Sequence, residues 1–253
     1  RTARYRSGEH VVKEIKTIAQ TGMKTIGIRD DIFTLHFRHV AAVTKAIVDN
    51  KLNHLTYGVG SRIDTMRKDM ISYLKQMNVN VATFGVETGS PTVQKRIIKD
   101  VDVAEVVPTI LKTNEAGIRT VTFFMLGHPG ETVEDINDTY SLIRDLSKHC
   151  GRRNAISLNI VCPYPGTGYW HDAEKKYDGL EFIDFYKNSY KYYHQAKPFV
   201  NITAMEDEVF YEQIDRVKRL GNRAIMKYRF HTAVDNPSLL ARKIKNVLIP
   251  SQN

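Results

Sequence analysis

The sequence predicts an α/β fold in which parallel strands alternate with helices around a barrel. Five segments share one pattern: an apolar run of strand-forming residues, a polar or glycine-rich loop, and a helix with one apolar face. They recur at intervals of roughly 25 to 40 residues, the length of a strand and helix unit. Each places polar residues just past its strand, and barrels of this kind build active sites at the carboxyl ends of their strands.

Composition allows one large domain and argues against several classes of protein. The 253 residues are 42% apolar, and 37 Lys and Arg against 28 Asp and Glu give a net charge of +9. The basic charge is dispersed, so we interpret it as a basic surface rather than as a nucleic-acid site. Two cysteines, Cys150 and Cys162, lack metal-ligand spacing, which predicts no metal site in this chain and a cytoplasmic location. No apolar run reaches the roughly 18 residues of a membrane span.

The first unit begins with a helix that Ser7 can cap and that Gly22 follows. A short strand from Lys24 to Arg29 then delivers Asp30 and Asp31. Two adjacent acids at a strand end suit an ammonium group, a metal ion or the cap of the next helix, and the sequence does not decide among these. The next helix is expected to bury Val40, Val43, Ile47 and Val48.

The second and third units place Arg62 and Glu87 after their strands. Arg62 follows a strand from Leu55 to Gly60; its planar fork suits a carboxylate or phosphate, and an ion pair with Asp64 is the alternative. Glu87 ends a strand that starts at Asn80, between two glycines that let a ligand approach the backbone. The helix between these strands is expected to bury Met66, Met70, Ile71, Leu74 and Met77.

A helix before the fourth strand carries an apolar stripe with a proline inside it. The stripe consists of Val103, Val106, Val107, Ile110 and Leu111. Pro108 is expected to kink this helix, because proline lacks the N–H that an interior turn needs.

The fourth unit reads most clearly. An unbroken apolar run ends at Gly127, a Pro-Gly turn follows, and Thr132 with Asp135 has the spacing of a capping box that opens a helix from Val133 to His149. We interpret His128 as packing in the loop, and Glu131 as a negative charge favoured before a helix N-terminus. The fifth strand, from Ile156 to Val161, ends in Cys162 and Pro163, and we interpret Cys162 as a small buried apolar residue.

The pattern changes after Thr167. An aromatic-rich segment from Tyr169 to Tyr193 is expected to pack over the barrel, with base stacking as the alternative. A helix from Glu206 to Tyr228 is followed by a short helix and tail from Pro237. Its basic stripe is expected to be a solvated face with at most non-specific affinity for nucleic acid. The stripe consists of Arg216, Arg219, Arg223 and Lys227, and the opposite face of Val209, Ile214, Val217, Leu220 and Ile225.

The strand ends together resemble the radical S-adenosylmethionine (radical SAM) superfamily. The motifs that carry this likeness are Asp30-Asp31-Ile32-Phe33, Ser61-Arg62-Ile63-Asp64, Gly85-Val86-Glu87-Thr88-Gly89-Ser90, Gly127-His128-Pro129-Gly130-Glu131-Thr132 and Pro163-Tyr164-Pro165-Gly166-Thr167. Within the superfamily the likeness is greatest to the branch whose members often carry a cobalamin-binding domain upstream. The matching order and spacing cover about residues 5 to 168.

The resemblance implies a fold, a reaction and partners. The fold would be a partial (β/α)6 barrel of the TIM type that lacks its first strand, over residues 1–168, with a mostly helical C-terminal extension over residues 169–253. Intact members cleave S-adenosylmethionine reductively at a [4Fe-4S] cluster, for radical chemistry or, with cobalamin, for methyl transfer. An electron donor such as flavodoxin or ferredoxin is implied as well. The substrate is not identified.

The resemblance also assigns roles to single residues. Asp30 and Asp31 would lie by the methionine amino group, and Arg62 by the methionine carboxylate or the substrate. Glu87 and Thr88 would hold the ribose hydroxyls. The residues that would flank adenine are Met125, Leu126, Gly127, Val161, Cys162 and Pro163.

One departure from the family is severe. The family's three-cysteine loop, which follows the first strand and holds the cluster, is absent from this sequence. Because the chain starts at Arg1 without an initiator Met, we expect that loop to lie upstream and the chain by itself not to turn over. The alternative is a barrel without a redox centre that serves as a binding module, with nucleic acid as a candidate partner. No Ser-His-Asp set, metal-ligand set or strand-end lysine supports an ordinary hydrolase or lyase.

Overall fold

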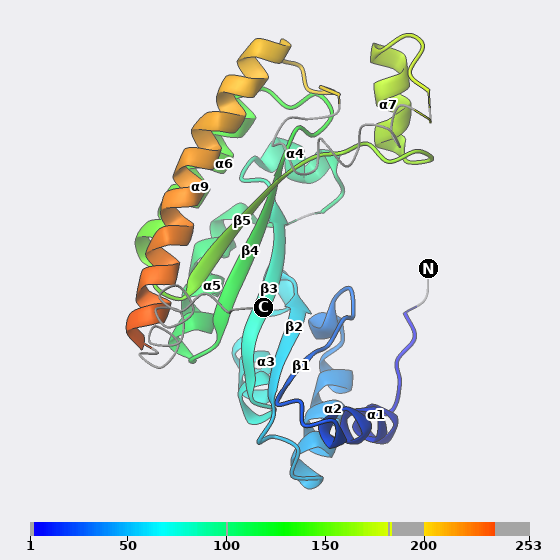
Figure 1. Cartoon of the computed structure of the whole chain (residues 1–253), viewed down its shortest axis with the longest axis vertical. Helices are drawn as coiled ribbons and strands as arrows, with labels where there is room; N and C mark the ends of the chain where they lie inside the picture. Colours follow the sequence, from blue (N-terminus) through cyan, green and yellow to red (C-terminus); the bar gives the residue numbers. More distant parts are fainter. Residues whose placement is uncertain (1–2, 100, 182, 184–199, 236–253) are drawn as a thin grey trace, which may run out of the picture.

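Five parallel strands form one sheet whose spatial order, β1-β2-β3-β4-β5, follows the chain (Figure 1). The computed structural model describes residues 3–99, 101–181, 183 and 200–235. The strands are β1 (Thr25–Gly27), β2 (Thr56–Ser61), β3 (Val79–Glu87), β4 (Arg119–Leu126) and β5 (Asn154–Ile160). Each predicted strand is present, and because every pair is parallel, all five carboxyl ends meet at one edge. The predicted α/β fold is confirmed.

The connections between strands are helical. The α-helices are α1 (Gly8–Gln20), α2 (Phe37–Asp49), α3 (Lys68–Gln76), α4 (Pro91–Arg96), α5 (Val106–Glu115), α6 (Val133–His149), α7 (Gly168–Lys176) and α9 (Asp207–Asp235). The described residues also form the short 3-10 helices η1 (Phe33–Leu35), η2 (Ile63–Thr65) and η3 (Val103–Glu105). In Figure 1, α4 and α7 lie beyond the same end of the sheet, which is the end where β3 and β5 finish.

The two faces of the sheet differ in burial. In β2, β3 and β4, buried residues alternate with partly exposed ones, as a strand with period two requires when helices cover one face. The more open face of β2 and β3 includes Gly58, Gly60 and Gly85. A face built from glycines leaves room for a ligand beside the backbone.

Local sequence signals explain where the helices begin. The Ser7 hydroxyl accepts a hydrogen bond from the His10 N–H at the start of α1, as predicted. Thr132 and Asp135 form both halves of the predicted capping box at the start of α6. The methionines expected in the core, Met66, Met70 and Met77, are buried. The prediction that Val48 and Leu111 are buried was wrong, since they are 38% and 37% exposed.

The helix expected to bend at Pro108 is instead two helices. Residues Val103–Glu105 form η3, and α5 begins at Val106. Pro108 is therefore the third residue of α5, where a backbone N–H has no intrahelical acceptor. The predicted interior kink was wrong because the proline lies in the first turn, which tolerates its missing donor.

Helix α9 runs along α6 and β5 (Figure 1). It buries Phe210, Ile214 and Val217, but Val209, which was predicted to face inward, is 37% exposed.

The basic stripe of α9 is only partly the solvated face that was predicted. The Arg216 guanidinium lies 4.6 Å from the centre of the Tyr140 ring. Lys227 Nζ donates a hydrogen bond to the Ser147 carbonyl at 2.7 Å. Two of the four basic residues thus attach α9 to α6, because their long side chains reach the neighbouring helix.

The aromatic-rich segment is described only in part. Trp170 of α7 is 5% exposed, as packing predicts, and the Tyr177 hydroxyl accepts a hydrogen bond from the Asn201 N–H at 3.1 Å. The tyrosines at 186, 190, 192 and 193 and the tail from Pro237 lie outside the described residues. Among the helices that the structure describes, none has the length and apolar character needed to cross a bilayer.

Candidate active site at the carboxyl ends of the strands

Glu87 stands at the end of β3 in an unusual backbone conformation. Its φ is +70°, and the pairing of β3 with β4 shifts between Gly85 and Glu87. A bulge of this kind re-aims the side chain that follows it, and left-handed backbone outside glycine concentrates at functional sites. The Glu87 carboxylate accepts a hydrogen bond from Lys99 Nζ at 2.8 Å.

Lys99 reaches Glu87 because of an unusual helix end. Ile98 has a φ of +55°, its N–H bonds to the Lys95 carbonyl, and the Lys99 N–H bonds to the Gln94 carbonyl. These two bonds form a Schellman motif, in which the left-handed position usually belongs to glycine. A β-branched residue there is strained, and the Ile98 side chain is 83% exposed. The strained conformation therefore gains no buried contact for Ile98. Its structural effect is to place Lys99 next to Glu87.

The loop after Glu87 is fixed to α6. Thr88 is fully buried, and its hydroxyl bonds with the Thr139 hydroxyl at 3.1 Å. The Gly89 N–H donates to the same hydroxyl at 2.9 Å, and a Cβ at Gly89 would lie 2.6 Å from the Asp138 carbonyl oxygen. The Thr88 side chain bonds to α6 and positions the loop, and its predicted contact with ribose stays a prediction.

The turn after β4 contains Glu131, which was interpreted from the sequence as a negative charge favoured before a helix N-terminus. Glu131 is fully buried, and its Oε2 accepts a hydrogen bond from the Gly127 N–H at 2.6 Å. Burial raises the pKa of Glu131 to about 7, although backbone N–H groups of Gly127 and His128 act in the opposite direction. In the sequence, this acid directly follows a Pro-Gly turn and lies five residues beyond the last residue of β4.

His128 packs in this turn, as predicted. It is 2% exposed, and its Nδ1 forms a hydrogen bond with the Tyr169 hydroxyl at 2.9 Å. Burial, with Arg96 and Lys99 nearby, lowers the pKa of His128 to about 4, so the ring is neutral at physiological pH. Within the described part of the chain, His128 Nε2 and Glu131 Oε1 are buried atoms without a hydrogen-bond partner.

Met125 and Leu126, the first two residues expected to flank adenine, lie in different apolar clusters. Met125 is partly buried and packs with Val161 in a small apolar cluster, whereas the Leu126 side chain belongs to the main core. Gly127 has a φ of +101°, and a Cβ there would lie 2.9 Å from the Phe210 ring. Glycine is therefore required at 127 both by the turn and by α9.

Past β5, the Val161 N–H continues the ladder by donating to the Leu126 carbonyl at 2.8 Å. Cys162 and Pro163 follow at the same edge. Cys162 is half-buried, and burial raises the pKa of its thiol, so it is not an activated nucleophile. This agrees with its interpretation as a small apolar residue.

Arg62 lies in the ion pair that was its alternative interpretation. Its Nε and Nη2 donate to the two carboxylate oxygens of Asp64 at 2.9 and 3.0 Å. Nη2 also donates to the Lys99 carbonyl at 3.2 Å, so the end of β2 is joined to the residue that pairs with Glu87.

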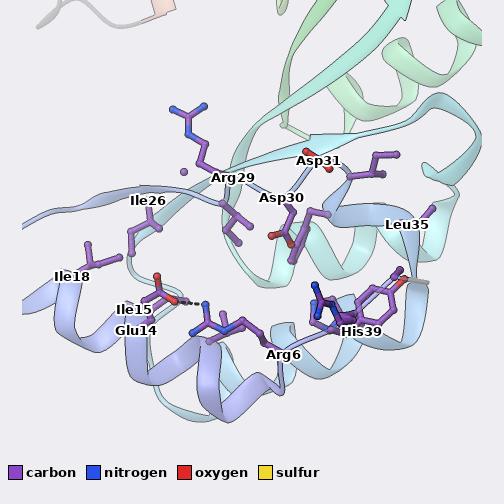
Figure 2. A pocket seen from close by; sticks show the side chains of 18 residues that line it. Arg6, Glu14, Ile15, Ile18, Ile26, Arg29, Asp30, Asp31, Leu35 and His39 are labelled. Atoms are coloured by element: carbon purple, nitrogen blue, oxygen red, sulfur yellow. Dashed lines mark hydrogen bonds and ion pairs between the residues drawn. The ribbon is translucent and has the colours of Figure 1, made fainter. Parts of the chain in front are cut away.

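Asp30 and Asp31 line a cavity of about 690 Å³ between the N-terminal segment, α1 and β1 (Figure 2). Figure 2 shows the Asp30 side chain pointing into this cavity, with the Arg6 and Glu14 ion pair across from it. Gly60 of β2 lies against the backbone of both acids: a Cβ there would be 3.1 Å from the Asp30 carbonyl oxygen. The cavity opens beside β1, the first strand in the order of the sheet. Glu87, at the end of β3, lies two strands away.

The chain's own residues do not fit an iron–sulfur cluster. Such clusters are held by three or four thiolates, and this sequence has two cysteines. Cys150 is buried at the C-terminus of α6 and Cys162 follows β5, so they stand at opposite ends of the sheet. No group of three or more potential metal ligands occurs among the described residues.

The carboxyl ends of the parallel strands thus bring together an acid at the end of β3, a glycine turn after β4 and an open face that includes glycines. The model of the radical SAM superfamily matches residues 1–143. The chain belongs to that superfamily, whose members use S-adenosylmethionine and a [4Fe-4S] cluster.

One curated relative and one solved structure resemble this chain over about two thirds of its length. The chain is 25% identical over 168 residues to an uncharacterized methyltransferase of Pyrococcus horikoshii, which covers 66% of this chain and 35% of the relative. It resembles the radical S-adenosylmethionine methyltransferase TsrM from Kitasatospora setae, with cobalamin and a [4Fe-4S] cluster bound. That match has a TM-score of 0.58 and 18% identity, and covers 68% of this chain and 34% of TsrM.

A second solved structure is the cobalamin-dependent S-adenosylmethionine radical enzyme OxsB with aqua-cobalamin and S-adenosylmethionine bound. Its TM-score is 0.50 at 11% identity, covering 86% of this chain and 32% of OxsB. At such identities the likeness shows a shared fold. The chain spans about a third of the length of the relatives it matches.

Proposed function

We propose that this chain forms the S-adenosylmethionine-binding part of a radical SAM enzyme that transfers a methyl group or carries out related radical chemistry. The observation that carries the proposal is Glu87, which a bulge and a left-handed φ of +70° place at the end of β3. The Glu87 side chain is 19% exposed, and its carboxylate is suited to accept hydrogen bonds from the two ribose hydroxyls. The loop behind it is held rigidly, which favours tight binding.

The other predicted site residues keep their assignments as proposals. The turn at Gly127 and the backbone from Val161 to Pro163 would flank adenine, together with Met125 and Leu126. Thr88 would join Glu87 at the ribose. Asp30 and Asp31 would take the methionine amino group. Arg62 would serve a ligand carboxylate only by giving up Asp64, so we assign it first to support of the Lys99 segment.

The redox step needs groups that this chain does not contain. A [4Fe-4S] cluster supplies the electron that cleaves S-adenosylmethionine, and we propose that cysteines outside this sequence hold it, with flavodoxin or ferredoxin as the electron donor. The residues of this chain bind and orient the nucleoside and keep water from it. The cobalamin seen in TsrM and OxsB favours a cobalamin-binding domain as a further partner. The substrate stays open.

We also propose two regions within the chain. Residues 1–168 form the partial barrel, and residues 169–253 form a C-terminal extension, whose described helix α9 packs along α6 and β5. The packing of α9 along α6 and β5 supports this division, because the extension adds a layer and no strand of its own among the residues described.

The test is titration of the chain with S-adenosylhomocysteine, a stable analogue, by isothermal calorimetry. We expect Glu87→Gln to weaken binding by about tenfold, since it removes one charge-assisted acceptor. The control is Glu134→Gln, at an exposed acid in the first turn of α6. Binding that Glu87→Gln leaves unchanged would remove Glu87 from the site. A chain that binds no analogue would contradict the proposed function.

A further inference from the structure

One buried carboxylate joins the two loops that form the nucleoside site. Asp135 Oδ1 accepts a hydrogen bond from the Ser90 hydroxyl at 2.5 Å. Asp135 Oδ2 accepts from the N–H and the hydroxyl of Thr132, both at 3.0 Å. Ser90 belongs to the loop after β3 and Thr132 to the turn after β4. The two loops are therefore linked through a single side chain.

Each of these partners also begins a helix. Ser90 caps α4 by accepting from the Val93 N–H at 3.2 Å, and Thr132 caps α6 by accepting from the Asp135 N–H at 3.3 Å. Glu87 lies three residues before Ser90, and Glu131 directly precedes Thr132. Asp135 therefore bonds to the caps of two helices, each of which begins close in sequence to an acid at the strand ends.

The contact has little freedom to relax. Asp135 is 7% exposed, and its carbonyl accepts from the Thr139 hydroxyl, which also receives the Gly89 N–H. Gly89 lies directly against α6, so the loop after Glu87 can pack on that helix in only one position. In a buried, fully bonded network of this kind, loss of one member is felt by the others.

The bonds to Asp135 favour its ionised form. Burial by itself raises the pKa of Asp135, but the hydrogen bonds from Ser90 and Thr132 outweigh it and lower the pKa below its ordinary value. Arg96 acts in the same direction. The bridge therefore consists of charge-assisted hydrogen bonds, which are stronger than neutral ones.

We propose that Asp135 is a positioning residue, which fixes the Glu87 loop against the Gly127 to Glu131 turn so that ribose and adenine are bound in one arrangement. The inference rests on the proposed function and deepens it. It differs from a simple capping role, in which Asp135 would stabilise the start of α6 and leave the nucleoside site unaffected.

A double-mutant cycle separates the two roles. S-adenosylhomocysteine is titrated into the wild-type chain, Asp135→Asn, Glu87→Gln and the double variant. We expect Asp135→Asn to weaken binding by about tenfold in the wild-type background and by less than about twofold in the Glu87→Gln background, since coupled residues are not additive. Glu134→Gln, at an exposed acid in the same helical turn, is the matched control and should bind as the wild type does.

A second measurement needs no ligand. Amide ¹H–¹⁵N spectra report the loop geometry, and Asp135→Asn should shift the signals of Gly89 and Gly127 together, while a capping role would confine changes to α6. Ser90→Ala, which keeps the acid and its bond to Thr132, should reproduce the loss of affinity and serves if Asp135→Asn does not fold. Unchanged affinity, or equal losses in both backgrounds, would overturn the positioning role. Absence of binding by the wild-type chain would instead count against the proposed function.

Discussion

Glu87 and Glu131 both follow strand ends, yet their surroundings prepare them for different work. Glu87 is partly exposed and paired with Lys99, so a ligand can reach its carboxylate. Glu131 is fully buried and bonds to the Gly127 N–H within its own turn. The first is suited to bind a ligand, and the second to hold the backbone that a ligand meets.

Glu131 should make the stability of the chain depend on pH. Its pKa rises from 4.5 to about 7 on folding, so its contribution is complete below pH 4.5 and is lost as the pH rises through about 7. Glu131→Gln mimics the neutral form. The wild type should therefore lose on the order of 3 kcal/mol relative to this variant between about pH 5 and pH 8.

Urea unfolding of both proteins at the two pH values measures this difference. Asp135, Arg96, His128 and Tyr169 surround Glu131, and their own titration cancels when the variant is subtracted from the wild type. Parallel pH profiles for the two proteins would mean that Glu131 is ionised throughout.

At the scale of elements, α9 and the segment before it support the turn after β4. Phe210 is fully buried near the start of α9, and its ring fills the space beside Gly127 that a side chain would take. The Gly130 N–H bonds to the Ile202 carbonyl, and the Ala204 N–H to the Glu131 carbonyl, both at 3.0 Å. The turn after β4 therefore depends on the segment from Val200 to Phe210 for its shape.

Truncation of Phe210 should be costly. Phe210→Ala is expected to destabilise the chain by about 3 to 5 kcal/mol, because it removes a buried ring and leaves a cavity. Phe230 lies on the same helix with 66% exposure, and Phe230→Ala should change stability by no more than about 0.5 kcal/mol. Chemical denaturation of the pair measures the contrast, and similar midpoints would show that α9 does not support the core at Phe210.

At the scale of the whole molecule, the net charge of +9 acts over the longest distance in solution. Because the Arg216 and Lys227 side chains contact α6, fewer basic side chains of α9 can contact the phosphates of a nucleic acid. General attraction to polyanions remains.

Binding of a fluorescent single-stranded oligonucleotide should accordingly be weak and independent of sequence. Its dissociation constant should rise by about tenfold or more between roughly 50 and 200 mM salt, since counterion release dominates such binding. Anisotropy titrations at both salt concentrations measure this. Tight binding that salt does not weaken would favour the binding-module alternative.

Most of the fold could be predicted because its signals are local. Helix and strand boundaries can be predicted from the short-range chemistry of Ser7, Thr132 and the glycines at turns. Val48, Leu111 and Val209 were misplaced because they lie at the margins of apolar stripes, where neighbouring helices decide exposure. Pro108 was misread because the point at which α5 starts depends on η3.

The site was predictable in outline and not in its supports. The acid at 87 follows from its strand end, but its left-handed backbone and its pairing with Lys99 depend on the bulge and on the strained turn at Ile98. The roles of Thr88, Glu131 and Asp135 arise from contacts across the fold, which spacing along one chain does not reveal.

The close contact of Gly127 with Phe210 has a consequence for engineering. An extension grafted from a relative in place of residues 200–235 would have to present a ring of the same size at the same point, or the turn after β4 would collapse or be forced outward. The turn after β4 and helix α9 are therefore not independently exchangeable, and chimeras that join them from different proteins should work only when the glycine and its aromatic partner are exchanged as a pair.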